Sequence, residues 1–301
     1  MRTGERGDSV VVTGASKGIG LETSVRLAAA GFRVWAGVRD AASGEIVESH
    51  AHRAGVRVNV IQLDVTDAPS VERAIARIVD EDRSLYAVVN NAGITYGGYF
   101  EDLTEAEVRR VLDVNLFGAM NVTRQVLPIM RAAGRGRVVM MSSYCGRIGT
   151  VAAAPYVASK FALEGWGESL ALEVRPFGID VVILEPGIIA TKLVDGDRGI
   201  GMHARDSRSP YAEWFRRAED QMDELIRGAG QTASDVAEAV HRAITVRRPR
   251  LRYVVGRRAR ILVNLRQRVP DALFERVYFG EMLRRVTGSR HTRASMARIG
   301  S

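Results

Sequence analysis

Cysteine, histidine and long apolar runs are scarce in this chain of 301 residues. Its single cysteine, Cys145, cannot form an intramolecular disulfide and cannot build a thiolate metal site alone. The five histidines are scattered without ligand spacing, so no metal site is expected. Residues 1–9 lack the apolar core of a secretory signal, and no window approaches the ~18 apolar residues of a membrane span. These absences exclude a disulfide scaffold and a membrane-spanning protein, and we expect a cytoplasmic location.

Lysine is also scarce, which makes the positions that carry one informative. Of 43 basic residues only Lys17, Lys160 and Lys192 are lysines, and the others are arginines. Lys160 follows Tyr156 by four positions, and residues four apart share one face of a helix. A nearby ammonium stabilises a phenolate, so we expect Lys160 to lower the pKa of Tyr156 from its usual value of about 10. An ordinary helix start with a surface lysine is the alternative.

The positive charge of the chain is concentrated at its C-terminal end. Residues 242–301 carry 16 arginines against three acidic residues, whereas the formal net charge of the whole chain is only +8. The preceding residues are therefore mildly acidic. Arginine richness with few aromatic residues and no recognition motif does not indicate nucleic-acid binding. We expect no nucleic-acid partner.

Short apolar segments alternate with longer helical patterns. The apolar segments predict strands at residues 10–12, 33–38, 56–63, 86–89, 138–141 and 179–184. Helices are predicted between them at residues 19–30, 45–54, 70–82, 105–132 and 156–175. Strands that are apolar throughout and separated by helices indicate a parallel sheet with helices on both faces, a doubly wound α/β fold of the Rossmann type. Ligands bind such a sheet where the carboxyl ends of its strands meet.

The alternation of strands and helices breaks down after residue 188. We expect residues 1–250 to form the catalytic domain, with a substrate lid at about 188–232 that ends in a helix at 211–226. A helix that merely packs on the body is the alternative to a lid.

The remaining residues, 251–301, are expected to form a basic C-terminal extension. It begins with a last strand at 252–255, continues with a helix at 270–286, and is predicted to be disordered after residue 288. The helix could close over the ligand pocket, pack on a neighbouring subunit or lie on an anionic membrane. Packing is the favoured interpretation, and membrane association through this helix is the less favoured one.

A glycine-rich turn follows the first predicted strand. The segment TGASKGIG at residues 13–20 has glycines at positions 14, 18 and 20. Glycines permit a tight turn and let the backbone approach a pyrophosphate at the positive end of the next helix. The spacing Gly-x3-Gly-x-Gly differs from the commoner Gly-x-Gly-x2-Gly. The turn predicts a dinucleotide site.

Further motifs stand where the later strands end. Asp64 ends the third predicted strand, NNAG at 90–93 ends the fourth, a serine pair at 142–143 ends the fifth, and Pro186-Gly187 ends the sixth. Together with Tyr156, Lys160 and Asn115, these motifs strongly resemble the short-chain dehydrogenase/reductase (SDR) superfamily over residues from about 10 to 195. The overall pattern is similar to its NADP-preferring members and to its steroid and retinoid branch. The resemblance implies an oxidoreductase that uses a nicotinamide cofactor.

The resemblance also implies roles for four side chains. Tyr156 would exchange a proton with the substrate oxygen, and Lys160 would tune Tyr156 and bind the nicotinamide ribose. Ser143 would hold the substrate oxygen, and Asn115 would position a water that links the lysine to solvent. Ser142 competes with Ser143, but strand alternation and the spacing to the tyrosine favour Ser143.

The end of the second predicted strand should select the cofactor. An acidic residue there would bind both ribose hydroxyls, whereas an arginine would accommodate a 2′-phosphate. Arg39 and Lys17 therefore favour NADP(H), although a shift of one residue would let Asp40 take the acidic role. The residues expected to contact the cofactor are Gly14, Ser16, Lys17, Gly18, Ile19, Gly20, Arg39, Asp64, Val65, Asn91, Ala92, Gly93, Tyr156, Lys160, Pro186, Gly187 and Thr191.

Apolar and aromatic residues near the ligand edge indicate an apolar ketone or secondary alcohol as substrate. They are Ile94, Tyr96, Tyr99, Phe100, Ile148 and Val151, with Arg147 as the one nearby cation. The first hypothesis is therefore an NADP(H)-dependent ketoreductase or alcohol dehydrogenase, with secondary metabolism as a candidate setting. The alternatives are an NAD-dependent dehydrogenase of a lipophilic alcohol and a family member that binds a dinucleotide for a structural or regulatory purpose. By resemblance we expect a homodimer or homotetramer.

Overall fold

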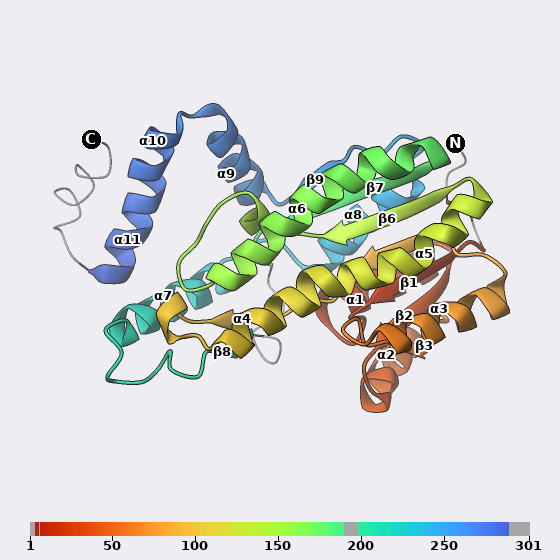
Figure 1. Ribbon diagram of the computed structural model, residues 1–301, viewed down its shortest axis with the longest axis horizontal. Helices are drawn as coiled ribbons and strands as arrows, with labels where there is room; N and C mark the ends of the chain where they lie inside the picture. Colours follow the sequence, from red (N-terminus) through yellow and green to blue (C-terminus); the bar gives the residue numbers. More distant parts are fainter. Residues whose placement is uncertain (1–3, 6, 190–197, 289–301) are drawn as a thin grey trace.

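The computed structural model describes residues 4–5, 7–189 and 198–288 (Figure 1). Within these residues a parallel sheet of seven strands forms the centre of the molecule. Its strands lie in the order β3 (Asn59–Gln62), β2 (Arg33–Val38), β1 (Ser9–Thr13), β4 (Ala87–Asn90), β6 (Gly136–Met141), β7 (Ile179–Pro186) and β9 (Arg252–Val255). A separate pair is formed by β5 (Thr95–Gly97) and β8 (Arg198–Ile200). The doubly wound Rossmann-type fold predicted from the sequence is confirmed.

Helices cover both faces of the sheet (Figure 1). One face carries α1 (Gly18–Ala29), α2 (Ala41–Arg53) and α8 (Ala233–Thr245). The other carries α3 (Ala68–Asp82), α5 (Ala119–Ala133) and α6 (Ala154–Val174). The remaining helices are α4 (Glu105–Leu112), α7 (Ala212–Arg227), α9 (Arg257–Arg268), α10 (Asp271–Phe274) and α11 (Gly280–Thr287). In the described ranges, no helix combines the length and the apolar character needed to cross a membrane.

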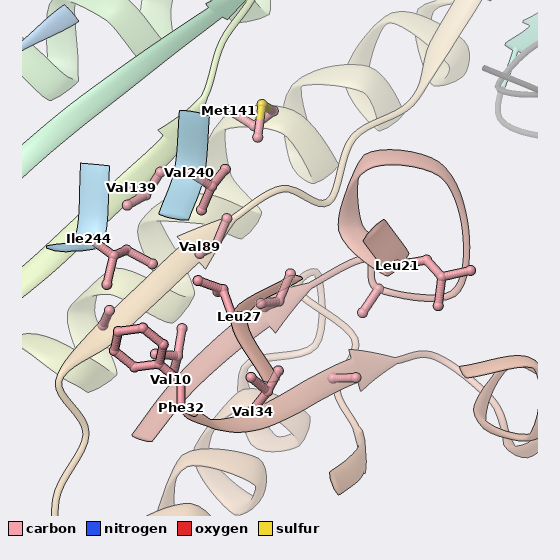
Figure 2. Packing of buried hydrophobic residues seen from close by; sticks show 14 of the residues in the cluster. Val10, Leu21, Leu27, Phe32, Val34, Val89, Val139, Met141, Val240 and Ile244 are labelled. Carbon is pink, nitrogen blue, oxygen red and sulfur yellow. The ribbon is translucent and has the colours of Figure 1, made fainter. Parts of the chain in front are cut away.

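The strands divide their side chains between two cores. Val10 and Val12 of β1 belong to one core and Val11 to the other, because successive residues of a strand point to opposite faces. Figure 2 shows the first core, where Leu27 of α1 and Val240 of α8 approach the strand side chains. Both cores are fully buried at their centres, which fixes the carboxyl ends of the strands in one rigid edge.

Several elements differ from the expected ones. The third strand covers only Asn59–Gln62 rather than residues 56–63. The helices α8 and α9 were not predicted. In α9, five arginines among 12 residues obscure the apolar pattern that would indicate a helix packed on the body. The expected helix at 270–286 is present as α10, a π-helical stretch at Glu275–Phe279 and α11.

Candidate functional site

A cleft of about 1090 Å³ opens at the carboxyl edge of the sheet. Strand ends and the turns after them form its floor, and α7, α9 and α11 contribute to its roof. The expected cofactor residues that line this cleft are Gly14, Ser16, Lys17, Ile19, Arg39, Asp64, Val65, Asn91, Ala92, Gly93, Tyr156, Lys160, Pro186 and Gly187. Thr191 lies outside the described residues, as do residues 190–197 of the expected lid and the tail after residue 288.

The glycine turn needs glycine for two reasons, which are positive φ values and the close approach of neighbouring atoms. Gly14 has a φ of +62° and Gly18 a φ of +55°, a region that L-residues with a side chain rarely adopt. A Cβ on Gly20 would lie 2.3 Å from the Gly14 carbonyl oxygen and 2.5 Å from Asn91 Nδ2. Asn91 Nδ2 donates to the carbonyl oxygens of Thr13 at 2.9 Å and Gly14 at 3.0 Å. Gly18 and Gly20 thus shape the turn without lining the cleft, and Asn91 ties the turn to the end of β4.

Arg39 and Asp40, which follow β2, bear on the choice between NADP(H) and NAD(H), and their side chains have different surroundings. Arg39 lines the cleft. Asp40 instead caps α2, because its Oδ1 accepts a hydrogen bond of 2.8 Å from the backbone N–H of Ser43. That backbone hydrogen bond lowers the pKa of Asp40 below its usual value. The side chain of Asp40 is therefore engaged in helix capping, which favours the alignment in which Arg39 faces the cofactor.

Tyr156 lies in the first turn of α6, beside Ser143 at the end of β6. Burial raises the pKa of the Tyr156 phenol well above its usual value, and Cys145 adds to this effect. A hydrogen bond with the Ser143 hydroxyl opposes it. The prediction that Lys160 lowers this pKa is wrong for this structure, because desolvation dominates and Lys160 Nζ is 5.6 Å from the centre of the phenol ring.

Lys160 is itself nearly removed from solvent, with 4% of its surface exposed. Its Nζ donates a hydrogen bond of 2.8 Å to the carbonyl oxygen of Met141. Burial lowers the pKa of Lys160 to about 8, against opposing effects of Cys145 and Glu164. The amine therefore lies where a small change of environment changes its charge near neutral pH.

Asn115 occupies a widened turn of its helix. The helical stretch from residue 105 to 133 is interrupted by a π-helix at Asp113–Gly118, which is a frequent feature of functional sites. Asn115 Nδ2 donates to the Ile94 carbonyl oxygen at 2.9 Å and to Ser159 Oγ at 3.0 Å, while its Oδ1 accepts from the Ile94 N–H at 2.8 Å. Asn115 does not line the cleft, and it joins the segment after β4 to α6.

The serine pair after β6 differs in surroundings. Ser143 Oγ accepts a hydrogen bond of 3.1 Å from the Cys145 N–H and also reaches the Tyr156 phenol. The buried Ser142 Oγ has no hydrogen-bond partner among the described residues. Burial raises the pKa of the Cys145 thiol, as suits a small buried side chain. The contact with the phenol distinguishes Ser143 from Ser142.

The roof of the cleft is mainly apolar and comes from elements late in the chain. Ile94 and Val151 line the cleft as expected, but Tyr96, Tyr99, Phe100 and Ile148 do not. Tyr99 stacks on Tyr211 at the start of α7, with ring centroids 4.7 Å apart, and Phe100 is 67% exposed. Ile148 is buried in a small core with Val263 and Phe274. The other apolar residues of the roof are Phe215, Met222, Leu225 and Ile226 from the expected lid helix, Tyr278 and Met282 from the expected C-terminal helix, and Leu262 of α9, which sequence reasoning missed.

Arg147 does not act as a clamp for an acidic ligand, because it takes part in a buried ion network. Its Nη1 lies 3.1 Å from Glu185 Oε1 on β7. Arg252 of β9 lies 2.9 Å from Glu164 Oε2 of α6 and 3.5 Å from Glu185 Oε1. Burial and the nearby Glu164 raise the pKa of Glu185 to about 7. The network joins the helix of Lys160, the loop after Ser143 and the strand that ends at Pro186.

Comparison with known proteins agrees with this architecture. Residues 8–198 match the model of the short chain dehydrogenase family, and the chain belongs to that family. Retinol dehydrogenase 8 of Bos taurus is 34% identical over 273 residues, covering 87% of this chain and 86% of its own. The 3-ketodihydrosphingosine reductase of Bacteroides thetaiotaomicron is 32% identical over 267 residues, covering 88% of this chain and 94% of its own.

A solved structure is similar over most of the chain as well. The actinorhodin polyketide ketoreductase with NADPH is 33% identical, with a TM-score of 0.68 over 79% of this chain and 90% of its own. The protein is thus an oxidoreductase of the SDR superfamily, whose members use a nicotinamide cofactor.

Proposed function

We propose that this protein is an NADP(H)-dependent oxidoreductase that transfers a hydride between the nicotinamide and an apolar ketone or secondary alcohol. One observation carries the proposal: Tyr156, Ser143 and Lys160 line the same cleft as the glycine turn, under an apolar roof. A proton donor, a holder of the substrate oxygen and a dinucleotide site therefore share one enclosed space.

The floor of the cleft fits a dinucleotide. A Cβ on Gly14 would lie 2.8 Å from the Ala92 backbone, and one on Gly20 would meet the Gly14 carbonyl oxygen, so the floor leaves no room for side chains there. Such a bare backbone at the start of α1 suits a pyrophosphate. Arg39 and Lys17 both line the cleft, and two cations at this end support NADP(H) over NAD(H).

The surroundings of Tyr156 suit the donation of a proton to a ketone oxygen. Because the pKa of the phenol is raised, Tyr156 is protonated at neutral pH and can donate to a carbonyl oxygen. The Ser143 hydroxyl, which reaches the same phenol, would hold that oxygen while negative charge develops on it. The cofactor, when bound, supplies the hydride. Lys160, with its pKa of about 8, would return a proton to the phenol after Tyr156 has donated its own.

The roof supports an apolar substrate. Phe215, Leu262, Tyr278 and Met282 line the cleft, together with Arg257, Arg258 and Arg285 from the same part of the chain. Arg147 is held in its ion network. Relatives named retinol dehydrogenase, 3-ketodihydrosphingosine reductase and polyketide ketoreductase support alcohols and ketones of this kind. On the same grounds we propose α7 as the described part of the substrate lid.

Oxidation of NADPH by purified protein, followed across ketones of increasing apolar size, tests the proposal. We expect turnover with the larger apolar ketones, and Tyr156→Phe should lower kcat by about 10²–10⁴-fold because the proton donor is lost. The variant should keep the Kd of NADPH, measured by fluorescence. A variant that kept most of its turnover would contradict the acid/base role of Tyr156.

The cofactor assignment has its own test. Arg39→Ala should raise the Kd of NADPH by about tenfold, the effect of one charge-assisted hydrogen bond, and leave the Kd of NADH nearly unchanged. Arg53→Ala at the end of α2 is a control, because Arg53 does not line the cleft. Equal losses for NADPH and NADH in Arg39→Ala would remove the argument from the 2′-phosphate.

A homodimer through α6 is also proposed. Phe117, Phe161 and Leu172 are 52%, 45% and 73% exposed on the π-helix and α6, which is unusual for side chains of this size. Covering them requires a partner, and a second copy of this chain offers the same surface. Phe161→Asp with Leu172→Asp should convert the oligomer to a monomer in light scattering, and a wild-type monomer would contradict this proposal.

A further inference from the structure

The last helices of the described chain have two different faces. Residues 257–287, here called the C-terminal helical segment, lie at the end of the molecule away from the N-terminus (Figure 1). Their inner face packs on the body through buried Ala259, Val263 and Phe274. The outer face is left without a covering element in the described residues, and the expected packing on a neighbouring subunit stays a prediction.

The outer face carries exposed aliphatic side chains in pairs. On α9, Ile261 and Leu265 are 51% and 47% exposed and stand four residues apart, so they share one face. Farther along, Leu273 and Val277 are 42% and 62% exposed at the same spacing. Each pair therefore presents aliphatic side chains on one face of its helix, and the segment exposes four such side chains in all.

Arginines surround these aliphatic side chains. The segment has eight arginines against three acidic residues. Two of the acids are engaged within it, since Asp271 pairs with Arg266, and Glu281 pairs with Arg285 at 2.7 Å. Among the described residues, no acidic group lies within ion-pair distance of Arg260 or Arg268 of α9. Neither of these two arginines lines the cleft, whereas Arg257 and Arg258 of the same helix do.

This combination selects one class of partner. A helix with aliphatic side chains between unpaired arginines matches the interface of an anionic bilayer, where the aliphatic groups enter the headgroup region and the arginines meet phosphates. A nucleic acid would make no use of the aliphatic pairs. A second copy of the same face would bring uncompensated positive charges together, which opposes pairing. Charge complementarity and apolar exposure together favour lipid.

We propose that the outer face of the C-terminal helical segment docks on the surface of an anionic lipid bilayer. The inner side of the same segment supplies Leu262, Tyr278 and Met282 to the roof of the cleft. Docking would therefore hold the roof next to the bilayer, where apolar ketones and alcohols accumulate. This consequence for substrate supply rests on the proposed function, whereas docking itself does not.

Flotation of the full chain with vesicles tests the proposal. We expect binding to phosphatidylcholine vesicles that contain about a third of phosphatidylglycerol, weak binding to pure phosphatidylcholine, and loss of binding at high salt. Arg260→Gln with Arg268→Gln should weaken binding by roughly thirtyfold, since each arginine contributes about 1 kcal/mol at such a surface. Ile261→Asn with Leu265→Asn should weaken it by at least about tenfold.

Matched variants elsewhere serve as controls. Ile46→Asn removes a side chain that is 54% exposed on α2, and Arg73→Gln removes an exposed arginine of α3. Both should bind vesicles like the wild type. None of the variants changes a residue that lines the cleft, so turnover of a water-soluble ketone should be unchanged in all of them.

Three results would overturn the proposal. They are a wild-type protein that does not float with anionic vesicles, binding that ignores the Ile261 and Leu265 substitutions, and a wild-type oligomer that the same substitutions dissociate. The second result would mark a purely electrostatic surface, and tighter binding to a short RNA duplex would then identify nucleic acid. If flotation succeeds but no ketone is reduced, the docking surface stands and the proposed function fails.

Discussion

The floor and the roof of the cleft differ in the kind of atoms that define them. Backbone defines the floor: glycines without room for a Cβ, strand ends fixed by two cores, and Asn91 bonded to main-chain groups. Side chains define the roof, where α7 and α11 are in contact and where Phe215, Tyr278 and Met282 line the cleft. A backbone surface tolerates little change, whereas a side-chain surface can be altered one residue at a time.

The largest expected effect comes from one methyl group in the floor. Gly20→Ala would place a Cβ 2.3 Å from the Gly14 carbonyl oxygen, and backbone cannot move aside as a side chain can. We expect a loss of about 3 kcal/mol in the free energy of unfolding and at least hundredfold weaker NADPH binding. Urea unfolding and fluorescence titration measure the two effects.

Gly165→Ala is the matched control in a helix. A Cβ on Gly165 meets no atom within 4 Å, so the change should stabilise the protein by up to about 1 kcal/mol through helix propensity. If both variants behaved alike, the floor would not be defined by its backbone.

Roof substitutions should have a smaller and more selective effect. Tyr278→Ala and Met282→Ala remove apolar surface above the cleft and leave the glycine turn untouched. We expect KM for a large apolar ketone to rise by about 10–70-fold, from a loss of roughly 1.5–2.5 kcal/mol of apolar contact, with the Kd of NADPH unchanged. Steady-state kinetics with a large and a small ketone separates the two. A parallel loss of NADPH affinity would show that floor and roof are not independent.

The buried ion network predicts the smallest effect, on the pH dependence of stability. The pKa of Glu185 is raised to about 7 in the folded chain, so its contribution is present below its usual pKa and is lost as pH rises through 7. Glu185→Gln should remove this loss, which we expect to be on the order of 2 kcal/mol between pH ~4.5 and ~7.5. Urea unfolding across that range measures it, with Glu173→Gln, an exposed position on α6, as the control. Parallel pH profiles for Glu185→Gln and wild type would contradict it.

The same division explains what could be predicted from the sequence. Gly14 of the glycine turn, Arg39, Ser143 and Tyr156 were predicted, and all four line the cleft. They could be predicted because the backbone geometry at strand ends requires short motifs that the sequence shows. Their chemical roles stay predictions. The predicted direction of the pKa shift of Tyr156 was wrong. The shift comes from burial by segments that are distant in the sequence, and no local pattern records such burial.

The roof left a weaker signal in the sequence. Apolar residues at helical spacing in 211–226 predicted α7, and Phe215, Met222, Leu225 and Ile226 of that pattern line the cleft, whereas Tyr211 does not. The five arginines of α9 hid the apolar stripe that holds Val263, and Tyr99 was assigned to the wall although it stacks on Tyr211. Such contacts join residues more than a hundred positions apart, so no local motif records them.

The π-helix at Asp113–Gly118 sets which face of α5 points to the sheet relative to α4. It contains one residue more than α-helical winding would use, so the two helices that flank it are rotated by about 100° relative to a continuous helix. Val111 before it, Asn115 within it and Val122 after it are all buried. Deletion of one residue from this segment would therefore rotate α5 about its axis by about 100° relative to α4, and the buried face of α5 would turn away from the sheet.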